Sequence, residues 1–400
     1  MKILQICNKV PFPPKDGGSI ATWALATGLV NEDAIIHILA LNTSKHAAAS
    51  VELPEDIKEN IQLEMIDHDT GIHIPSLVFN LFFSRQPYNL IRFYSARFQS
   101  KLKDFLTREH FDIVLIEGIA MCQYISTIRK VSRAKIIYRA HNSEFQIWQR
   151  LSMNTSSVLK KHYYKILAKR VDRFESKQFQ LIDALVSISK NDEKEFREQG
   201  YEGPVHHTPY GINFSEHDAS LEIKNKDLIF LGALDWEPNI IGLEWFIYKV
   251  WTRLKHSNPD LSFHVAGRNP SEKIMNLCKQ QGICFYGEIE DPVDFLKKGS
   301  VLVVPLFSGS GMRVKIVEGM ALGKCIVSTS QGLEGIPAEA GKHLLIADTD
   351  ELFLKSIKAL TSNPNYCEQI SIDAKEFIKE NFNNFTLTRK LADFFNTLSL

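Results

Sequence analysis

Short apolar runs alternate with longer mixed segments along the chain, and this alternation predicts a series of strands and helices. Lys2 to Cys7 is predicted to form a buried strand, followed by an apolar helix from about Ile20 to Val30. Continuous runs of Val, Ile and Leu are typical of parallel strands that are covered on both faces. Further strands are predicted at 37–41, 112–117, 135–138 and 184–188, and helices at 145–180 and 189–199. This half of the chain therefore predicts a doubly wound α/β sheet.

A second series begins at Asp227, after the polar stretch SEHDASLEIKNK at 215–226, which we interpret as a linker. Two strand–helix series joined by one linker predict two Rossmann-like α/β domains facing a central cleft in which a ligand binds. We place the domains at 1–218 and 226–382, and expect a C-terminal helix at 383–400 to pack back on the first domain. The second series predicts strands at 227–234, 262–266, 283–287, 301–306 and 325–328, and helices at 240–256, 271–281, 292–298, 350–360, 366–381 and 386–398.

Composition narrows the function classes. A length of 400 residues suggests about two domains, and 44% hydrophobic with 24% charged residues is typical of folded cores. The formal net charge is +0, so nothing indicates a nucleic-acid partner. The six cysteines are scattered without a CxxC pair, which favours free thiols in a reducing compartment over disulfides or zinc.

Two segments bear on the membrane. The first residues, MKILQICNKV, become polar too quickly for a signal peptide, and no apolar run reaches the ~18 residues of a bilayer span. We therefore expect a cytoplasmic protein. Residues 76–106 mix aromatic side chains with Arg and Lys and contain almost no acid, which is typical of an amphipathic segment that contacts anionic lipid at the inner membrane face or a lipid-linked acceptor. A helix pair packed on the sheet explains the segment equally well.

The stretch VLVVPLFSGSGMRVKIVEGMALGKCIVSTSQGLEG at 301–335 predicts a strand, a glycine-rich loop, a helix from about Arg313 to Leu322, and a strand. Arg313 and Lys315 lie in the first helical turn, where the helix dipole disfavours cations. An anion bound between them explains the pair. Glu318, three residues beyond Lys315, is placed to accept hydrogen bonds from paired hydroxyls such as those of ribose. A surface helix with an ion pair and a flexible loop is the alternative interpretation.

Three shorter patterns are also of interest. Gly17 and Gly18 separate the first strand from its helix, where a ligand can approach the backbone closely or where a tight turn is simply needed. His141 follows a strand, at the edge where open α/β sheets bind ligands, although a packing histidine fits too. Asp348-Thr349-Asp350 has the form of a metal-binding DxD motif, but it directly precedes a helix, so we interpret it as a helix cap.

The stretch PLFSGSGMRVKIVEGMALGKCIVSTSQGLEGI resembles the C-terminal signature of the GT-B glycosyltransferases, family 4. The Gly17-Gly18 loop, His141, TPYGIN at 208–213 and FLGALDWEPNIIGLEWF at 230–246 match the family in the same order, so the resemblance covers essentially the whole chain. Two positions depart from the pattern. Ser310 stands where the family usually has the first of two glutamates, and Ala233-Leu234-Asp235-Trp236 stands where the family often has an Arg and a Lys.

The resemblance implies a retaining glycosyltransferase that moves a hexose from a UDP- or GDP-linked sugar to a glycan or lipid-linked acceptor, in polysaccharide biosynthesis. It implies no cofactor and no metal, because cations supply the positive charge at the diphosphate. Arg313 and Lys315 are expected to replace the missing Arg and Lys. Glu318 is expected to hold the ribose, and His141 to contact the donor sugar or its leaving oxygen.

The resemblance also assigns weaker donor-binding roles. The backbone of Gly287 and Glu288 is expected to meet the base, and Arg268 is a further candidate for the diphosphate. The remaining donor-binding candidates are Gly17, Gly18, Gly211, Ser310, Gly311 and Met312.

Three other functions compete with transfer. A nucleotide-sugar 2-epimerase shares this fold but needs no acceptor. A catalytically inactive sugar-nucleotide-binding subunit is suggested by Ser310. A two-domain solute-binding protein also has a cleft, but it should carry an export signal.

Overall fold

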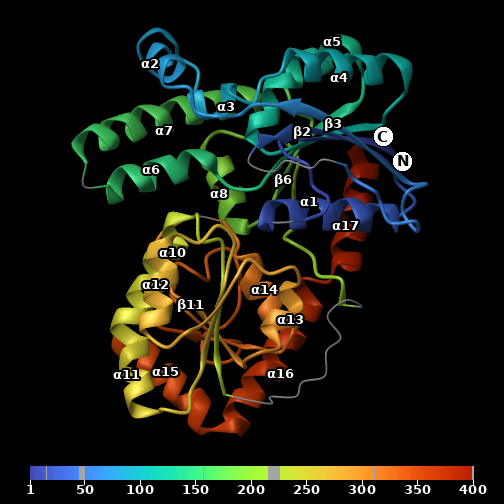
Figure 1. Ribbon diagram of the computed structural model, residues 1–400. Helices are drawn as coiled ribbons and strands as arrows, with labels where there is room; N and C mark the ends of the chain where they lie inside the picture. The colour runs from blue at the N-terminus through green and yellow to red at the C-terminus, as the bar shows by residue number, and fades with distance from the viewer. Residues whose placement is uncertain (15, 45–49, 156, 215–225, 310, 399–400) are drawn as a thin grey trace. The chain divides into compact units, whose positions relative to one another are not determined.

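The computed structural model describes residues 1–14, 16–44, 50–155, 157–214, 226–309 and 311–398 (Figure 1). The chain forms two compact units: unit 1 consists of residues 1–211 and 384–400, and unit 2 of residues 212–383. Each unit contains one parallel sheet covered by helices, so the predicted fold class, two doubly wound Rossmann-like units, is confirmed. The predicted linker at 215–226 lies, apart from Lys226, outside the described residues.

Unit 1 has a seven-stranded sheet in the order β3-β2-β1-β4-β5-β6-β7, and every pairing is parallel. Its strands are β1 Lys2–Cys7, β2 Ile35–Thr43, β3 Ile61–His68, β4 Ile113–Glu117, β5 Lys135–Ala140, β6 Ala184–Ser187 and β7 Val205–His207. Its helices are α1 Gly17–Val30, α2 Ile74–Phe83, α3 Tyr88–Ile91, α4 Ala96–Arg108, the 3-10 helix η2 Ile119–Tyr124, α5 Ile125–Val131, α6 Glu144–Asn154, α7 Val158–Gln178, α8 Lys190–Glu198 and α17 Asn384–Leu398.

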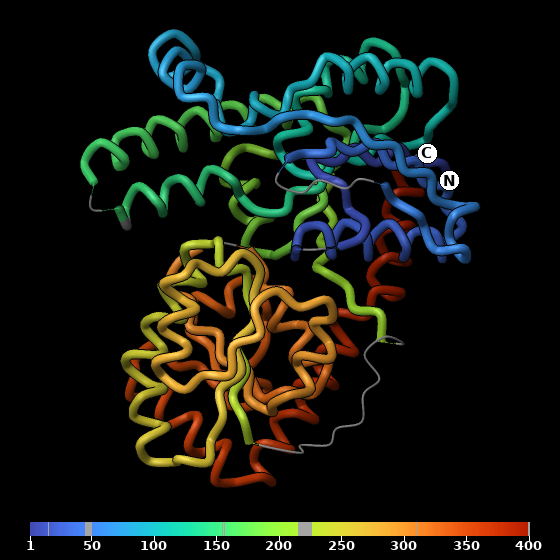
Figure 2. The backbone as a smooth tube through the Cα atoms, viewed as in Figure 1, coloured from blue at the N-terminus to red at the C-terminus, as the bar shows by residue number. Residues whose placement is uncertain are grey.

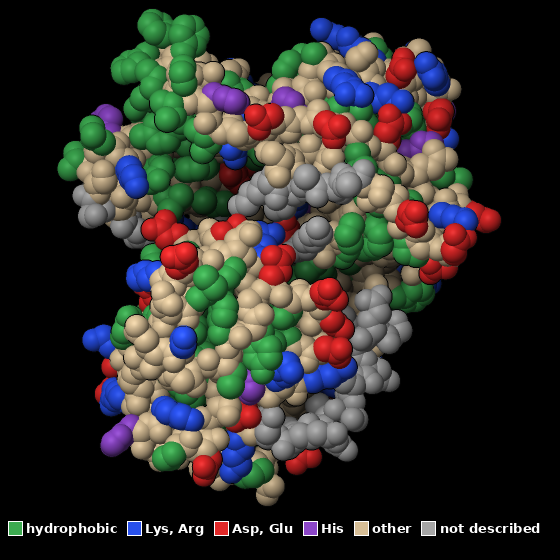
Figure 3. Space-filling model, in the orientation of Figure 1, with side chains coloured by type: hydrophobic (Ala, Val, Ile, Leu, Met, Phe, Trp, Pro, Cys, Tyr) green, Lys and Arg blue, Asp and Glu red, His purple; other side chains and the backbone are tan. Residues whose placement is uncertain are grey.

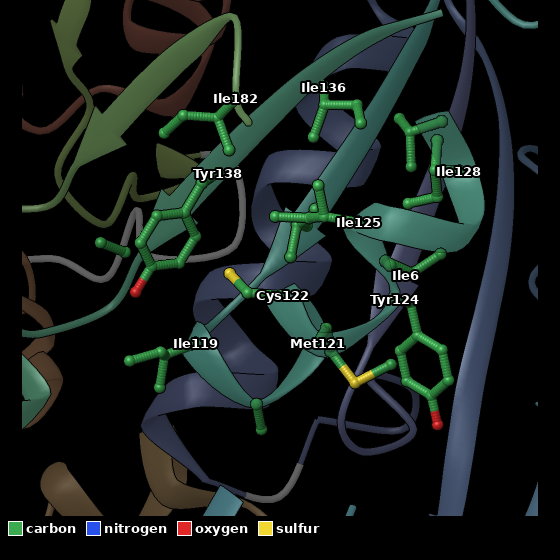
Figure 4. Packing of buried hydrophobic residues seen from close by; sticks show 14 of the residues in the cluster. Ile6, Ile119, Met121, Cys122, Tyr124, Ile125, Ile128, Ile136, Tyr138 and Ile182 are labelled. Carbon is green, nitrogen blue, oxygen red and sulfur yellow. The ribbon is translucent and has the colours of Figure 1, made fainter. Parts of the chain in front are cut away.

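The sheet of unit 1 has an apolar core on each face. Successive residues of a strand point to opposite faces, so Leu4 and Ile6 of β1 belong to one core while Ile3 and Cys7 belong to the other. Figure 4 shows the first of these cores, where side chains of η2 and α5 pack toward β1 and β5. Burial on both faces explains why β1, β4 and β5 are recognisable as uninterrupted apolar runs.

The end of the chain belongs to unit 1. Helix α17 lies beside α1, as the tube in Figure 2 shows. The side chain of Asn384 donates from Nδ2 to the carbonyl of Ala24, 2.8 Å away. Leu391 and Phe395 of α17 are fully buried in the core on this face of the sheet. Unit 1 is therefore completed by residues nearly 400 positions from its first strand.

Unit 2 has a six-stranded parallel sheet in the order β10-β9-β8-β11-β12-β13. Its strands are β8 Leu228–Leu231, β9 Phe263–Ala266, β10 Cys284–Gly287, β11 Val301–Val304, β12 Cys325–Ser328 and β13 Leu345–Ile346. Its helices are α10 Glu237–Phe246, the π-helical turn η3 Ile247–Trp251, α11 Thr252–Ser257, α12 Glu272–Gln280, α13 Pro292–Leu296, α14 Val314–Ala321, α15 Asp350–Ser362 and α16 Pro364–Asn381.

The strand order reverses at the first strand of each sheet, between β1 and β4 in unit 1 and between β8 and β11 in unit 2. Crossovers leave in opposite directions at such a switch point, which opens a crevice outside the carboxyl ends of the two strands. This crevice lies beside the segments that follow β8 and β11 in unit 2, and beside those that follow β1 and β4 in unit 1.

Several elements differ from those predicted. Strand β3 was not predicted, because its sequence IQLEMIDH is half polar and lies at the sheet edge. The single helix predicted at 145–180 is two helices, α6 and α7. Gly17 and Gly18 are the first residues of α1 and not a loop, because Asp16 caps the helix directly before them.

Candidate functional site

Lys315 lies at the switch point of unit 2. It is the second residue of α14, the helix that follows β11, yet its ammonium reaches the end of β8. Its Nζ donates to the carbonyl of Leu231 at 2.9 Å and to Oδ1 of Asn239 at 3.0 Å. Leu231 is the last residue of β8 and Asn239 lies in the first turn of α10. The side chain of Lys315 therefore connects the two halves of the sheet where their carboxyl ends meet.

The environment of Lys315 disfavours its charge. Burial, together with the neighbouring Arg313 guanidinium, lowers the Lys315 pKa to about 7. Its ammonium lies 5.0 Å from the centre of the Phe230 ring. Among the residues that the structure describes, no carboxylate forms an ion pair with it, and its two hydrogen-bond acceptors are neutral oxygens. An incoming anion would supply the missing negative charge.

Arg313, where the helix was predicted to start, is the N-cap residue of α14, which begins one position later. Its side chain is buried, and the guanidinium carbon lies 5.5 Å from the centre of the Trp236 ring. Trp236 is the N-cap residue of α10, so this stacking also joins the segments after β8 and β11. Glu318 lies about one turn along α14 from Lys315 and is half-exposed.

Other predicted residues of unit 2 are arranged around the neighbouring strand ends. Gly287 ends β10 with a φ of 69°, and its carbonyl accepts the N–H of Gly267 at 2.8 Å. Glu288 is exposed. The Nε of Arg268 lies 3.6 Å from Oδ1 of Asp235, so this guanidinium already has a local carboxylate partner.

The glycine-rich loop before α14 contains the remaining donor-binding candidates of this unit. Gly311 has a φ of 84°, which favours glycine, and Met312 is half-buried. Ser310, the departure from the family pattern, lies outside the described residues. The donor-binding roles of these residues stay predictions.

His141 in unit 1 is held by a carboxylate. Its Nε2 lies 2.5 Å from Oε2 of Glu117, the last residue of β4. The His141 side chain is 23% exposed whereas that of Glu117 is 1% exposed, so the ring bridges a buried anion and the surface. The contact occupies Nε2 and leaves Nδ1 as the ring nitrogen that can meet a ligand.

Glu117 is the centre of a buried polar cluster. Arg139 Nη1 donates to both of its oxygens, at 3.0 and 3.3 Å, and Gln5 Nε2 donates to Oε1 at 2.7 Å. Burial by itself raises the Glu117 pKa, but the Arg139 guanidinium, the His141 ring and the Gln5 amide outweigh burial and lower this pKa to about 2. Glu117 is therefore ionised at neutral pH, and its charge is balanced by Arg139.

Sequence reasoning missed Glu117 and Arg139. The signal was present, because the apolar runs DIVLIE and KIIYRA each place a charged residue where a buried strand ends. A charge in such a position needs a partner. Which charges are partners depends on the pairing of β4 with β5, in which Glu117 lies opposite Arg139.

The glycine candidates of unit 1 have local structural explanations. The N–H groups of Gly18 and Ser19 donate to the Asp16 carboxylate, which caps α1. A Cβ on Gly211 would lie 2.7 Å from Cα of Asn384, so only glycine fits there. These contacts account for the glycines without a ligand, and the donor-binding roles of Gly17, Gly18 and Gly211 stay predictions.

The DxD-like motif forms a helix cap. The Thr349 hydroxyl accepts the N–H of Leu352 at the start of α15, and Asp348 accepts from the N–H and hydroxyl of Ser330. Within the described part of the chain, no group of three or more His, Cys, Asp or Glu side chains is placed to hold a metal ion. Nor does any described helix combine the length and apolar character that crossing a bilayer requires.

The region that contains Lys315 is similar to a known protein family. Residues 225–363 match the family model described as glycosyl transferases group 1. The chain is also similar to a 44.6 kDa protein in the cps region of Klebsiella pneumoniae, with 25% identity over 406 aligned positions. The alignment covers 96% of this chain and 97% of that protein.

Solved structures share the fold over the whole chain. A sucrose-phosphate synthase from Thermosynechococcus elongatus superposes with a TM-score of 0.73 at 12% identity, over 100% of this chain and 99% of that one. Anabaena Alr3699/HepE, solved in complex with UDP and glucose, superposes with a TM-score of 0.70 at 12% identity, over 99% and 100% of the two chains. The architecture is GT-B, and together with the family match it supports a glycosyltransferase.

Proposed function

We propose that the protein is a retaining glycosyltransferase that transfers a hexose from a nucleotide-diphosphate sugar, UDP- or GDP-linked, to a glycan or lipid-linked acceptor, without a metal ion. The observation that carries this proposal is Lys315, a partly buried ammonium at a sheet switch point whose two acceptors are neutral oxygens. The group 1 family match over unit 2 and the UDP bound to a protein of the same fold support a nucleotide diphosphate as the anion.

The reaction needs positive charge at the leaving group. The bond between the anomeric carbon and the diphosphate oxygen breaks, the electron pair stays on the diphosphate, and the acceptor oxygen bonds to the same face of the sugar. The acceptor proton moves to the departing phosphate oxygen. Arg313 and Lys315 stabilise the charge that grows on this oxygen, and preorganised donors of this kind act most strongly where water is excluded.

The roles of the remaining side chains follow from their chemistry. Glu318 accepts hydrogen bonds from the ribose hydroxyls. His141 acts on the donor sugar through Nδ1, because Glu117 holds Nε2 and fixes the orientation of the ring. The name of the Klebsiella relative, a protein in the cps region, supports a place in polysaccharide biosynthesis.

The test begins with donor binding. A thermal-shift panel of UDP-, GDP- and ADP-sugars on the purified full chain should show one nucleotide that raises the melting temperature, since a ligand that binds only the folded state stabilises it. With that donor and an oligosaccharide acceptor library, nucleotide release should require an acceptor and should persist in EDTA. Lys315→Ala should lower kcat by about 10²- to 10³-fold.

Three outcomes would contradict the proposal. Release of nucleotide together with a 2-epimerised sugar in the absence of acceptor identifies the epimerase. Nucleotide binding without turnover under any condition identifies an inactive binding subunit. Loss of activity in EDTA contradicts the metal-free mechanism. Lys324→Ala, one turn beyond the end of α14, is the matched control for removing a lysine from this segment.

A further inference from the structure

Helix α2 exposes its apolar side chains. Asn80 is its one buried residue among the described positions, although most of the helix is aliphatic or aromatic. Five apolar side chains along the helix are exposed by 45–77%, namely Ile74, Val78, Phe79, Phe82 and Phe83. A helix packed for stability alone places such residues inward, so this orientation calls for a partner.

The outward orientation is built into unit 1. Arg170 of α7 donates from Nη1 to the carbonyl of Asn80 at 3.2 Å and to its Oδ1 at 3.0 Å, and from Nη2 to the carbonyl of Leu81 at 2.7 Å. At the other end of α2, the Tyr88 hydroxyl bonds both the N–H and the carbonyl of His73. Polar contacts on the inner side thus hold α2 with its apolar side outward.

A second apolar group lies at the other end of α7, where α6 and α7 meet. Its members, 38–85% exposed, are Leu151, Met153, Val158 and Leu159. Figure 3 shows hydrophobic side chains gathered over α2 and again at this end of α7. Arg170, which holds α2, lies eleven residues from Leu159, or about 17 Å along the helix axis. The two apolar groups therefore lie along one helix.

Basic side chains occupy the helix between these groups. Lys161, Lys165 and Lys169 are exposed and follow one another at four-residue spacing, which places them in one row on α7. We call α2, the α6–α7 apolar group and this lysine row the apolar–basic face. Residues 70–103 and 145–171, the segments that include these elements, contain no Asp or Glu but five and six Lys or Arg respectively, in a chain whose formal net charge is +0.

We propose that the apolar–basic face docks unit 1 on an anionic lipid bilayer. The aromatic residues of α2 enter the boundary between headgroups and acyl chains, and the lysine row contacts lipid phosphates. We assign this face to a bilayer for two reasons. The apolar groups are spread over exposed helices on either side of a row of lysines, and segments with Lys and Arg but without Asp or Glu attract an anionic surface. The inference does not depend on glycosyl transfer, because docking is measured without substrates.

The prediction of an amphipathic segment at 76–106 is refined by this arrangement. Only α2 exposes an apolar side, whereas Phe98, Leu102 and Leu106 of α4 are buried in the core of unit 1. The other half of the face comes from α6 and α7, which the predicted segment did not include.

Cosedimentation of the full chain with vesicles tests the proposal. The wild type should bind vesicles of phosphatidylcholine with 30% phosphatidylglycerol at least tenfold more strongly than pure phosphatidylcholine vesicles, a ratio that falls as salt rises. Phe82→Asp with Phe83→Asp, and separately Lys161→Glu with Lys165→Glu and Lys169→Glu, should each lower binding to the anionic vesicles about tenfold or more.

Matched variants of unit 2 provide the controls. Ile372→Asp replaces an exposed apolar residue of α16, and Lys355→Glu with Lys358→Glu and Lys379→Glu reverses three exposed lysines. Both should bind vesicles as the wild type does. Absence of wild-type binding, equal binding to both lipid compositions, or equal loss in the controls overturns the proposal. Self-association that the α2 variant abolishes, without lipid binding, assigns the face to a second copy of the chain instead.

Discussion

Two ionisable residues of the candidate sites, Lys315 in unit 2 and Glu117 in unit 1, differ in how their charge is balanced. Glu117 is buried and Lys315 is partly buried, and their surroundings shift the two pKa values for different reasons. Burial and Arg313 lower the Lys315 pKa to about 7, whereas Arg139 and His141 overcome burial and keep Glu117 ionised. Glu117 already has cationic partners and holds the His141 ring, whereas the acceptors of Lys315 are neutral oxygens, which is why we assign anion binding to Lys315 as a proposal.

The affinity for a nucleotide diphosphate should depend on the protonation of Lys315. The anion favours the ammonium, so binding takes up a proton above pH 7 and affinity falls as pH rises. Between pH 7 and 9 the Kd of UDP, or of whichever diphosphate the panel identifies, should rise by up to about tenfold per pH unit. Isothermal titration calorimetry in buffers of different ionisation enthalpy measures the proton directly. Lys315→Met should weaken binding and remove the slope, and an unchanged slope in this variant contradicts the assignment.

Glu117→Gln should destabilise unit 1 because it leaves the Arg139 guanidinium buried without a charge partner. Loss of one partner of a buried pair costs about 3 kcal/mol. The Glu117 pKa is lowered from 4.5 to about 2 in the folded protein. The stabilisation of the fold by ionised Glu117 is therefore fully present above pH 4.5 and is lost as the pH falls toward 2. Urea unfolding between pH 3 and 7 should therefore show a smaller pH dependence in the variant than in the wild type. Parallel pH curves for the two proteins would show that the pair contributes nothing.

At the scale of elements, the segment before α14 is held by α10. A Cβ on Gly242 of α10 would lie 1.9 Å from the carbonyl oxygen of Pro305, the residue directly after β11. This backbone approach fixes where the chain leaves β11 and turns toward Arg313. The placement of Lys315 against Leu231 thus depends on how two helices pack at the end of one sheet.

Gly242→Ala should move this segment. Overpacking against a backbone atom costs about 1–3 kcal/mol, and the displacement should weaken nucleotide binding as well as stability. Ile241→Ala, at the neighbouring half-exposed position, is the control and should alter neither by much. Thermal melting with and without nucleotide measures both effects. Wild-type melting and affinity in Gly242→Ala would show that the segment adjusts freely.

At the scale of the whole molecule, the chain leaves unit 1 at residue 211 and returns to it at 384. Unit 2 is therefore an insertion between β7 and α17. The core of unit 1 depends on the last helix, α17, because Phe395 of this helix is fully buried in that core. Phe385 of the same helix is 54% exposed.

Phe395→Ala should destabilise unit 1 by about 3–5 kcal/mol, because it removes a large buried side chain and leaves a cavity. Nucleotide affinity, which we assign to unit 2, should stay near that of the wild type at temperatures where unit 1 is folded. Phe385→Ala is the matched control in the same helix. Equilibrium unfolding monitored by circular dichroism gives the comparison, and equal effects of the two substitutions would contradict the role of α17 in this core.

The sequence by itself determined the kinds of element and much of their order. Apolar runs such as VLVV at β11 and the alternating polar stretches between them are local patterns, and local periodicity reports which residues face a core. The same local reasoning selected Arg313 and Lys315, as cations at the start of a helix, and His141, which follows a strand at the edge where such sheets bind ligands. This reasoning failed for β3, because β3 is a half-polar strand at the sheet edge and lacks the apolar run of a strand that is covered on both faces.

Only the tertiary structure decided which of these elements meet. Leu231 and Lys315 are 84 residues apart, and Glu117 and His141 are 24 residues apart; strand pairing, which periodicity does not encode, brings each pair together. The direction that α2 faces was also undetermined, because an apolar stripe has the same spacing whether it is covered or exposed. Arg170, bonded to Asn80, settles that direction by a contact across 90 residues.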